Sequence, residues 1–321
     1  MKKKGKKNLK QLARREYLPL AATAAMWGVI VLAIGHADTA RLLASVTMVR
    51  AVQLSTRLAT PMSLKLRLQA DASVQKQAKR LAFTAQMGAL AVALSVVALL
   101  AQSMKAIGQD QIAAFLPFVA LGMPARYLRL SDVRSASPYY RLALAGSGLI
   151  TVSLGWGLAW PVTLMGLAFS AREWVAYMAL RFWPRAPRVP EGQTDEPLTF
   201  DEIARNSVIL GRRLLTYRLT KSLLAVFGPV GNAAARTSRG LNWHSRIEPY
   251  VPHHLGGFIA FFLATFGGAI FVALRSGEPA AMILAAGLLQ VGGACLNVIL
   301  LWRWLPDRHV DIKLGYDDDD E

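Results

Sequence analysis

The chain has 321 residues, of which 54% are hydrophobic, and its mean hydropathy is +0.33. This composition is too apolar for an ordinary water-soluble domain and is typical of a multi-pass membrane protein. The formal net charge is +17. Because the basic residues cluster beside apolar segments, they indicate anionic lipid as the partner and argue against nucleic acid. The single cysteine, Cys295, lies in an apolar segment, so no disulfide can form within the chain.

The N-terminal part predicts a basic tail followed by a membrane hairpin. Residues 1–17 are predicted to lie in the cytoplasm near anionic headgroups. The apolar run Leu18–Gly35 carries no signal-peptide cleavage site and predicts an uncleaved first span. After a turn at His36–Asp38, the stretch Ala37–Ala59 predicts a second span, which ends before Pro61.

Four further apolar stretches complete a predicted six-span unit over residues 18–183. They are Leu81–Gln102, Ile112–Tyr127, Leu142–Trp160 and Val162–Trp183. The stretch Ile112–Tyr127 is the weakest, because Pro117 and Pro124 interrupt it. Membrane helices tolerate such breaks where neighbouring helices cover the freed backbone groups.

The remainder of the chain divides by charge and hydropathy into three parts. These are a basic cytoplasmic linker over 184–254, a two-span hairpin over 255–305 and an acidic cytoplasmic tail over 306–321. Within the linker, Thr199 and Glu202 have the spacing of a capping box, which predicts the start of a helix near 199–227.

Loops rich in lysine and arginine alternate with nearly uncharged loops along the whole chain. The positive-inside rule then places the N-terminus, Pro61–Arg80, Arg126–Arg141 and the segment after Trp183 in the cytoplasm. The predicted fold is therefore all-α: a polytopic membrane helix bundle of about eight transmembrane helices with both termini inside. The predicted location is the inner (plasma) membrane of a bacterium.

The second predicted span carries polar residues on one face. At about 100° per residue, Thr47, Arg50, Gln53 and Arg57 align. An arginine in hydrocarbon costs several kcal/mol on insertion scales, so such residues usually face a bundle interior or a wet cavity. We interpret the face as an inward polar stripe, around which the other helices are organised. The alternative is that these side chains snorkel to the membrane surface.

A second ionisable pair, Arg172 and Glu173, lies near the middle of the sixth predicted span. Adjacent residues on a helix point about 100° apart, so each needs a partner on another helix or in water. Arg50 lies at a similar depth, which predicts a Glu173–Arg50 pair. We expect Arg57 and Arg172 to face a cavity open to the cytoplasm. The candidate substrate-binding residues are Arg50, Gln53, Arg57, Arg172 and Glu173. The alternative is a purely structural polar clamp.

Other polar groups carry weaker signals. Gln290 and Asn297 are seven residues apart in the last span and predict hydrogen bonds between helices. The spacing of His244, Glu248, His253 and His254 matches no standard metal motif. The sequence therefore predicts no metal site, no cofactor and no catalytic residue, and an enzyme has no positive signal.

Two basic loops and the paired first hairpin carry a family resemblance. The loops read RLATPMSLKLRLQADASVQKQAKR and FLPFVALGMPARYLRLSDVRSASPYYR. With their spans, over at most Leu18–Trp183, they resemble the N-terminal lobe of multidrug/oligosaccharidyl-lipid/polysaccharide flippases. Members of that family have two six-span lobes around a central cavity, whereas this chain has one such unit and two more helices. The resemblance implies a homodimer or another partner, and arginines that bind the phosphate of an anionic lipid-linked substrate.

Three functions remain open from the sequence. The first is a flippase-like transporter of an anionic lipid-linked substrate, either a polysaccharide lipid or a phospholipid. The second is a non-catalytic assembly or regulatory subunit of an envelope or lipid biosynthesis complex, which would use Pro184–His254 to contact its partner. The third is a membrane-embedded lipid-modifying enzyme with its site near Asn242–His254. A transporter predicts a water-accessible cavity lined by Arg50, Arg57 and Glu173.

Overall fold

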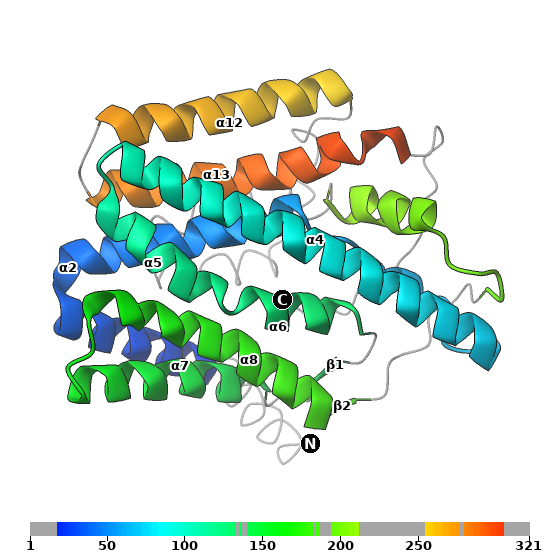
Figure 1. Ribbon diagram of the computed structural model, residues 1–321, viewed down its shortest axis with the longest axis horizontal. Helices are drawn as coiled ribbons and strands as arrows, with labels where there is room; N and C mark the ends of the chain where they lie inside the picture. Colours follow the sequence, from blue (N-terminus) through cyan, green and yellow to red (C-terminus); the bar gives the residue numbers. More distant parts are fainter. Residues whose placement is uncertain are drawn as a thin grey trace, which may run out of the picture.

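The chain forms a bundle of helices that run side by side along the longest axis (Figure 1). The computed structural model describes residues 18–132, 135–136, 140–182, 184–185, 194–211, 254–275 and 279–304. Within these ranges the chain is helical apart from loops and one two-residue strand pair, in which β1 (Ser135–Ala136) lies antiparallel to β2 (Pro184–Arg185). The predicted all-α class is confirmed.

The predicted first hairpin is one element, α2 (Leu18–Ser55), divided at a glycine. Gly35 has φ 76° and ψ 172°, a left-handed conformation that side chains with a Cβ rarely adopt. The two arms of α2 meet at this residue and diverge from the left-hand end of the bundle (Figure 1). The second arm ends at Ser55, earlier than the predicted Ala59, so Arg57 lies beyond the helix.

A broken helix follows the long helix α4 (Ala72–Ala106). The elements α5 (Asp110–Ala120) and α6 (Met123–Leu130) are bent by 42° relative to each other. Pro117 lies inside α5, and a second proline lies in the first turn of α6. Proline removes a backbone donor and disfavours helix in the preceding residue, so the predicted interruption is found at this point.

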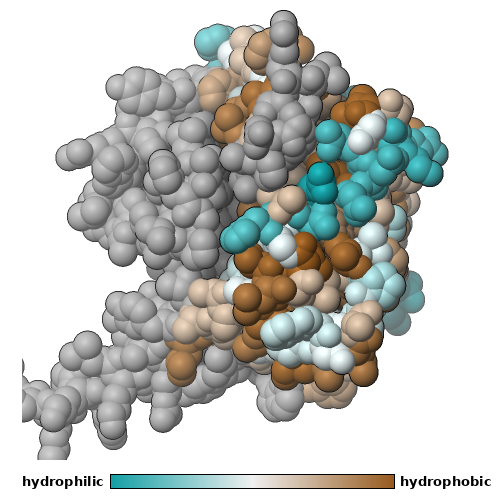
Figure 2. All heavy atoms as spheres, turned by 90° about the vertical axis from the view of Figure 1, so that its left-hand side faces the viewer, coloured by the Kyte–Doolittle hydropathy of each residue, from teal (hydrophilic) through white to brown (hydrophobic). Residues whose placement is uncertain are grey.

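Two helical hairpins complete the bundle. The first consists of α7 (Tyr140–Gly157), the short η2 (Val162–Gly166) and α8 (Leu167–Phe182). The second consists of α12 (Leu255–Arg275) and α13 (Pro279–Leu300), followed by η4 (Trp302–Trp304). The turn between α7 and α8, the turn between α4 and α5, the break in α2 and the facing ends of α12 and α13 lie at the left-hand end (Figure 1). Figure 2 looks onto that end, where a group of hydrophilic residues lies above mixed and hydrophobic ones.

The main hydrophobic core is built around α2, which packs against α5, α7 and α13. Its fully buried side chains include Met26, Leu42, Phe115 and Met123. The helix α2, which contains both the first and the second predicted span, is thus the central element of the bundle.

The apolar helices are typical of a membrane protein. Among the described residues, Ala21–Ser55, Ala72–Ala106 and Leu255–Val272 are long and apolar enough to cross a bilayer. The bent pair α5–α6 makes a fourth candidate if it counts as one span. Two shorter apolar helices, Ala143–Gly157 and Gly287–Leu300, lie within α7 and α13.

The stretch between α2 and α4, which belongs to the predicted basic cytoplasmic loop Pro61–Arg80, packs into the bundle. It contains α3 (Thr60–Lys65), in which Thr60, Met62, Ser63 and Leu64 are buried. A helix over residues 200–211, part of the predicted linker, packs against this stretch. Ile203 of that helix belongs to the same small core as Leu64.

Candidate arginine cluster at the helix break

A carboxylate on α8 pairs with two arginines on the broken helix. Glu173 Oε1 lies 3.4 Å from Arg126 Nη1, and Glu173 Oε2 lies 3.2 Å from Arg129 Nη2. Residues three apart on a helix share a face, so α6 presents both guanidinium groups to the same carboxylate. The side chain of Glu173 is 21% exposed, that of Arg126 is 18% exposed and that of Arg129 is 25% exposed. The cluster is therefore partly open and not sealed in the core.

Hydrogen bonds from α8 hold the helix break in place. Ser170 Oγ donates to the carbonyl oxygens of Phe118 and, at 3.1 Å, Val119. Trp174 Nε1 donates to the carbonyl oxygen of Leu121 at 3.0 Å. These carbonyls lie at the end of α5, where a helix leaves acceptors without intrahelical donors. Satisfying them from α8 fixes the direction in which α6 leaves the break.

The backbone of the break also approaches α8 closely. A Cβ atom at Gly122 would lie 2.9 Å from the Cα atom of Ser170 and 3.2 Å from Cβ of Glu173. Any residue with a side chain would force α6 away from α8, so the glycine keeps Arg126 and Arg129 within reach of Glu173.

Two further arginines act on Glu173 at longer range. Arg50 of α2 and Arg172 of α8 both lie close enough to interact electrostatically with its carboxylate. Two arginines thus pair with Glu173 and two more act on it at longer range, so arginines outnumber carboxylates in this group at the junction of α2, α6 and α8. Arg50 is exposed, whereas its neighbours Val49 and Ala51 are buried. This contrast shows that α2 turns the charged side chain away from the hydrophobic core.

Packing against α7 positions Arg172. A Cβ atom at Gly148 would lie 2.7 Å from Arg172 Cδ and 2.7 Å from Met26 Sδ, so the stem of the arginine lies over the glycine. Within the described part of the chain, Arg172 Nε is buried without a hydrogen-bond partner. Van der Waals contact therefore holds the stem, while the charge of its head remains available to the cluster.

The structure brings together three of the five predicted site residues. Arg50, Arg172 and Glu173 belong to the cluster. Gln53 is buried, and Arg57 is partly buried beyond the end of α2. The predicted alignment of Arg57 with Arg50 assumed a helix that continues to Ala59, and that assumption is wrong because α2 ends earlier.

The sequence did not identify the two direct partners of Glu173. Arg126 and Arg129 were assigned to a cytoplasmic loop, whereas they lie on α6. Their spacing of three residues, directly after a span broken by two prolines, was the available signal. The predicted Glu173–Arg50 pair stays a prediction; Arg50 interacts electrostatically with the Glu173 carboxylate.

A second charge pair joins the turn that follows α3 to the helix over 200–211. Both terminal nitrogens of Arg67 donate to the two carboxylate oxygens of Glu202. Arg67 Nη1 also donates to the carbonyl oxygen of Ser63 at 3.0 Å, and Nε to that of Glu196 at 3.1 Å. Arg67 is only 2% exposed. The guanidinium group is thus fully engaged, and we call this group of contacts the Arg67 lock.

Two other predictions, the interhelical hydrogen bonds of Asn297 and the capping box of Thr199 and Glu202, can also be compared with the structure. Asn297 Nδ2 donates to the carbonyl oxygens of Ser55 and Arg57, both at 2.9 Å, so it joins α13 to the end of α2. The Glu202 backbone N–H donates to Thr199 Oγ1 at 3.3 Å, which is half of the predicted capping box; the Glu202 side chain serves the Arg67 lock.

The histidine-rich candidate is largely outside the described residues, which hold only His254 of its four members. Within the described ranges, no group of three His, Cys, Asp or Glu side chains could hold a metal ion. Compared with known proteins, the chain matches no protein-family model, no curated protein and no solved structure.

Proposed function

We propose that the protein is a flippase-like membrane transporter that binds the phosphate of an anionic lipid or lipid-linked substrate at the arginine cluster. The observation that carries the proposal is the surplus of positive charge: Arg50, Arg126, Arg129 and Arg172 lie around the single carboxylate of Glu173. Charged groups within apolar helices are costly and usually mark a substrate pathway.

The chemistry of the cluster suits a phosphate group. Guanidinium groups present several donors in a planar fork that matches phosphate and carboxylate oxygens. Glu173 uses one terminal nitrogen each of Arg126 and Arg129, at distances of 3.4 and 3.2 Å. The remaining donors and the partial exposure of these side chains leave room for an anionic ligand.

The broken helix supports transport in preference to a fixed clamp. Many transporters place their binding sites at discontinuous membrane helices, where backbone breaks line the substrate site. Here the break at Leu121–Gly122 lies directly before the two arginines of α6. A passive clamp needs neither a helix break nor an excess of one charge.

The proposed topology has about eight spans with both termini in the cytoplasm. Each arm of α2 is roughly 27–30 Å long at 1.5 Å per residue, close to the hydrocarbon thickness. The turns at the left-hand end in Figure 1 carry no excess of basic residues, and the basic stretches follow the opposite ends of the helices. This distribution is the one that the positive-inside rule predicts. The flippase resemblance adds that a second copy or another chain completes the transport unit.

The test is lipid movement in proteoliposomes. The purified full-length chain is reconstituted with fluorescent phosphatidylglycerol, and dithionite quenching measures how fast lipid reaches the outer leaflet. We expect faster movement than in protein-free vesicles and a loss of at least about tenfold in Arg129→Gln, which corresponds to about 1.4 kcal/mol. Arg41→Gln is the matched control, because Arg41 pairs with Asp38 near the break in α2.

Protein-containing vesicles that move lipid no faster than empty ones would overturn the transport proposal. An assembly subunit would then become the better explanation, because it requires the bundle but no movement of lipid.

A further inference from the structure

The long helix α4 extends well beyond the apolar stretch that would cross a membrane. It contains 35 residues, which is roughly 52 Å at 1.5 Å per residue, whereas the hydrocarbon core is about 30 Å thick. The apolar stretch begins near Leu81, so the first turns of α4 protrude on the side that carries the basic loops. Residues 72–83, here called the α4 overhang, therefore lie at the level of the lipid headgroups.

The overhang carries cations that no acid neutralises. Lys76, Lys79 and Arg80 are exposed and form no ion pair within the described ranges of the chain. Arg67, in the same basic stretch of sequence, is already bound to Glu202. The overhang thus keeps its positive charge available for a partner outside the protein.

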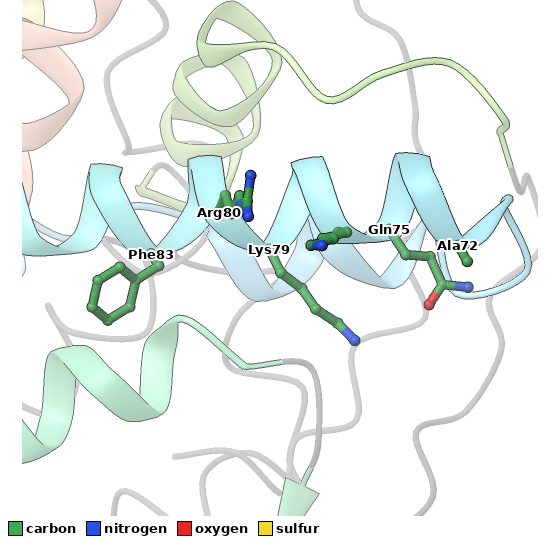
Figure 3. Close-up of a pocket in the computed structure, with 6 residues that line it drawn as sticks. Ala72, Gln75, Lys79, Arg80 and Phe83 are labelled. Atoms are coloured by element: carbon green, nitrogen blue, oxygen red, sulfur yellow. The ribbon is translucent and has the colours of Figure 1, made fainter.

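These side chains border an open pocket of about 480 Å³. Its lining residues all come from α4: Ala72, Gln75, Lys76, Lys79, Arg80 and Phe83. In Figure 3, Lys79, Gln75 and Phe83 point to one side of the helix, and Arg80 points to the other, toward the helix over 200–211. The pocket is within the range of small-ligand sites, roughly 300–1,000 Å³.

The walls of the pocket are fixed by the protein. Gln75 Nε2 donates to the carbonyl oxygens of Leu68 at 3.0 Å and Ala70 at 2.9 Å, which ties the first turns of α4 to the preceding loop. Ala78 and Ala82 are buried in the core that α4 shares with α3 and the helix over 200–211. The overhang is thus a supported helix with one packed side and one basic side.

We propose that the α4 overhang binds the headgroup of an anionic phospholipid from the cytoplasmic leaflet. Lys76 and Lys79 would contact the phosphate, Arg80 would add positive charge from the neighbouring face of the helix, and Phe83 would lie against the first carbons of the acyl chains. The order of the side chains favours lipid over an acidic protein, because the cations lie directly before an exposed aromatic residue and then a membrane-length apolar stretch. Basic segments at this depth attract anionic lipid. The proposal requires α4 to cross a membrane but does not require transport.

The experiment is site-resolved photolabelling of the full-length protein in phosphatidylcholine proteoliposomes. The probe is phosphatidic acid with a diazirine close to its glycerol, at a sub-saturating amount, and mass spectrometry locates the labelled residues. We expect labelling within 72–83, reduced about fivefold by Lys79→Gln and about 25-fold by Lys76→Gln with Lys79→Gln, since each lysine near anionic lipid contributes roughly equally. Lys105→Gln is the control, because it removes an exposed lysine from the opposite end of α4.

Two further measurements show whether the labelling comes from a lipid or from phosphate alone, and whether it depends on the arginine cluster. Unlabelled phosphatidic acid should compete with the probe, and the same concentration of inorganic phosphate should not. Arg129→Gln should leave labelling of 72–83 unchanged, so failure of the transport proposal and failure of this one are distinguishable. Equal labelling of 72–83 in the double variant, or equal labelling by a phosphatidylcholine probe, would overturn the proposal.

Discussion

The Arg67 lock and the arginine cluster both pair guanidinium groups with a carboxylate, but they differ in the ratio of the two groups. In the lock, one arginine meets one carboxylate with both terminal nitrogens; Arg67 is 2% exposed and Glu202 is 25% exposed. In the cluster, one carboxylate serves two arginines directly and two more at a distance, and Glu173 is 21% exposed. A balanced pair whose arginine is buried holds segments together. An unbalanced, open group retains charge that can act on a ligand.

The two regions also differ in how their backbones are held. The lock joins the helix over 200–211 to α3 through additional neutral bonds, such as Asn206 Nδ2 to Ser63 Oγ at 2.8 Å and the Ala59 N–H to Ser207 Oγ at 2.8 Å. The cluster lies at a helix break that depends on α8 for its hydrogen bonds. We therefore expect the lock to control stability and the cluster to control function.

The largest effect on stability should come from Glu202→Gln. This change leaves the buried charge of Arg67 without its counter-ion, and breaking such a pair costs about 3 kcal/mol of unfolding free energy. Chemical unfolding in detergent micelles measures it. Glu196→Gln is the control, because the exposed Glu196 side chain forms no ion pair within the described ranges. Equal unfolding curves for wild type and Glu202→Gln would show that the lock does not stabilise the fold.

An intermediate effect is expected from Gly122→Ala. The new Cβ atom would lie 2.9 Å from the Cα atom of Ser170, and forcing two backbones apart costs about 1–3 kcal/mol. The same displacement moves Arg126 and Arg129 from Glu173, so lipid movement should fall as well. Gly88→Ala, at a position on α4 with open space, should keep wild-type stability. A Gly122→Ala variant that unfolds like wild type would contradict the close packing of α6 on α8.

The smallest effect on stability is expected from Arg41→Gln. Arg41 pairs with Asp38 at 2.7 Å, but its side chain is 39% exposed, and exposed ion pairs contribute about 0.5 kcal/mol or less. Thermal unfolding should shift by no more than a degree or two. A loss as large as that in Glu202→Gln would show that the number of charges, and not their burial and balance, determines the stability of this bundle.

Much of the bundle was predictable because apolar length and proline position are local signals. The prolines of Ile112–Tyr127 predicted the broken helix, and the turn at His36–Asp38 predicted the reversal in α2, which the structure places at the adjacent Gly35. The end of α2 was not predictable locally. Asn297, more than two hundred positions away in the sequence, binds the carbonyl oxygens that follow the helix, and Thr56 hydrogen-bonds to Tyr127.

In the candidate site, too, some residues could be predicted from local sequence signals and others depend on contacts between helices. Glu173, Arg172 and Arg50 stood out because ionisable residues are rare in apolar stretches. Arg126 and Arg129 did not, because they follow a weak span and their role depends on the packing of α6 against α8. The periodicity of a helix predicts on which face of that helix a residue lies. It does not predict which neighbouring helix packs against that face.

The most direct test compares movement of phosphatidylglycerol with that of phosphatidylcholine in proteoliposomes for two opposite charge changes. Arg129→Gln lowers the positive surplus around Glu173, and Glu173→Gln raises it. If the surplus selects anionic headgroups, the ratio of phosphatidylglycerol to phosphatidylcholine movement should fall several-fold in Arg129→Gln and rise in folded Glu173→Gln. The same ratio in wild type and both variants would contradict a role for the cluster in recognising the substrate.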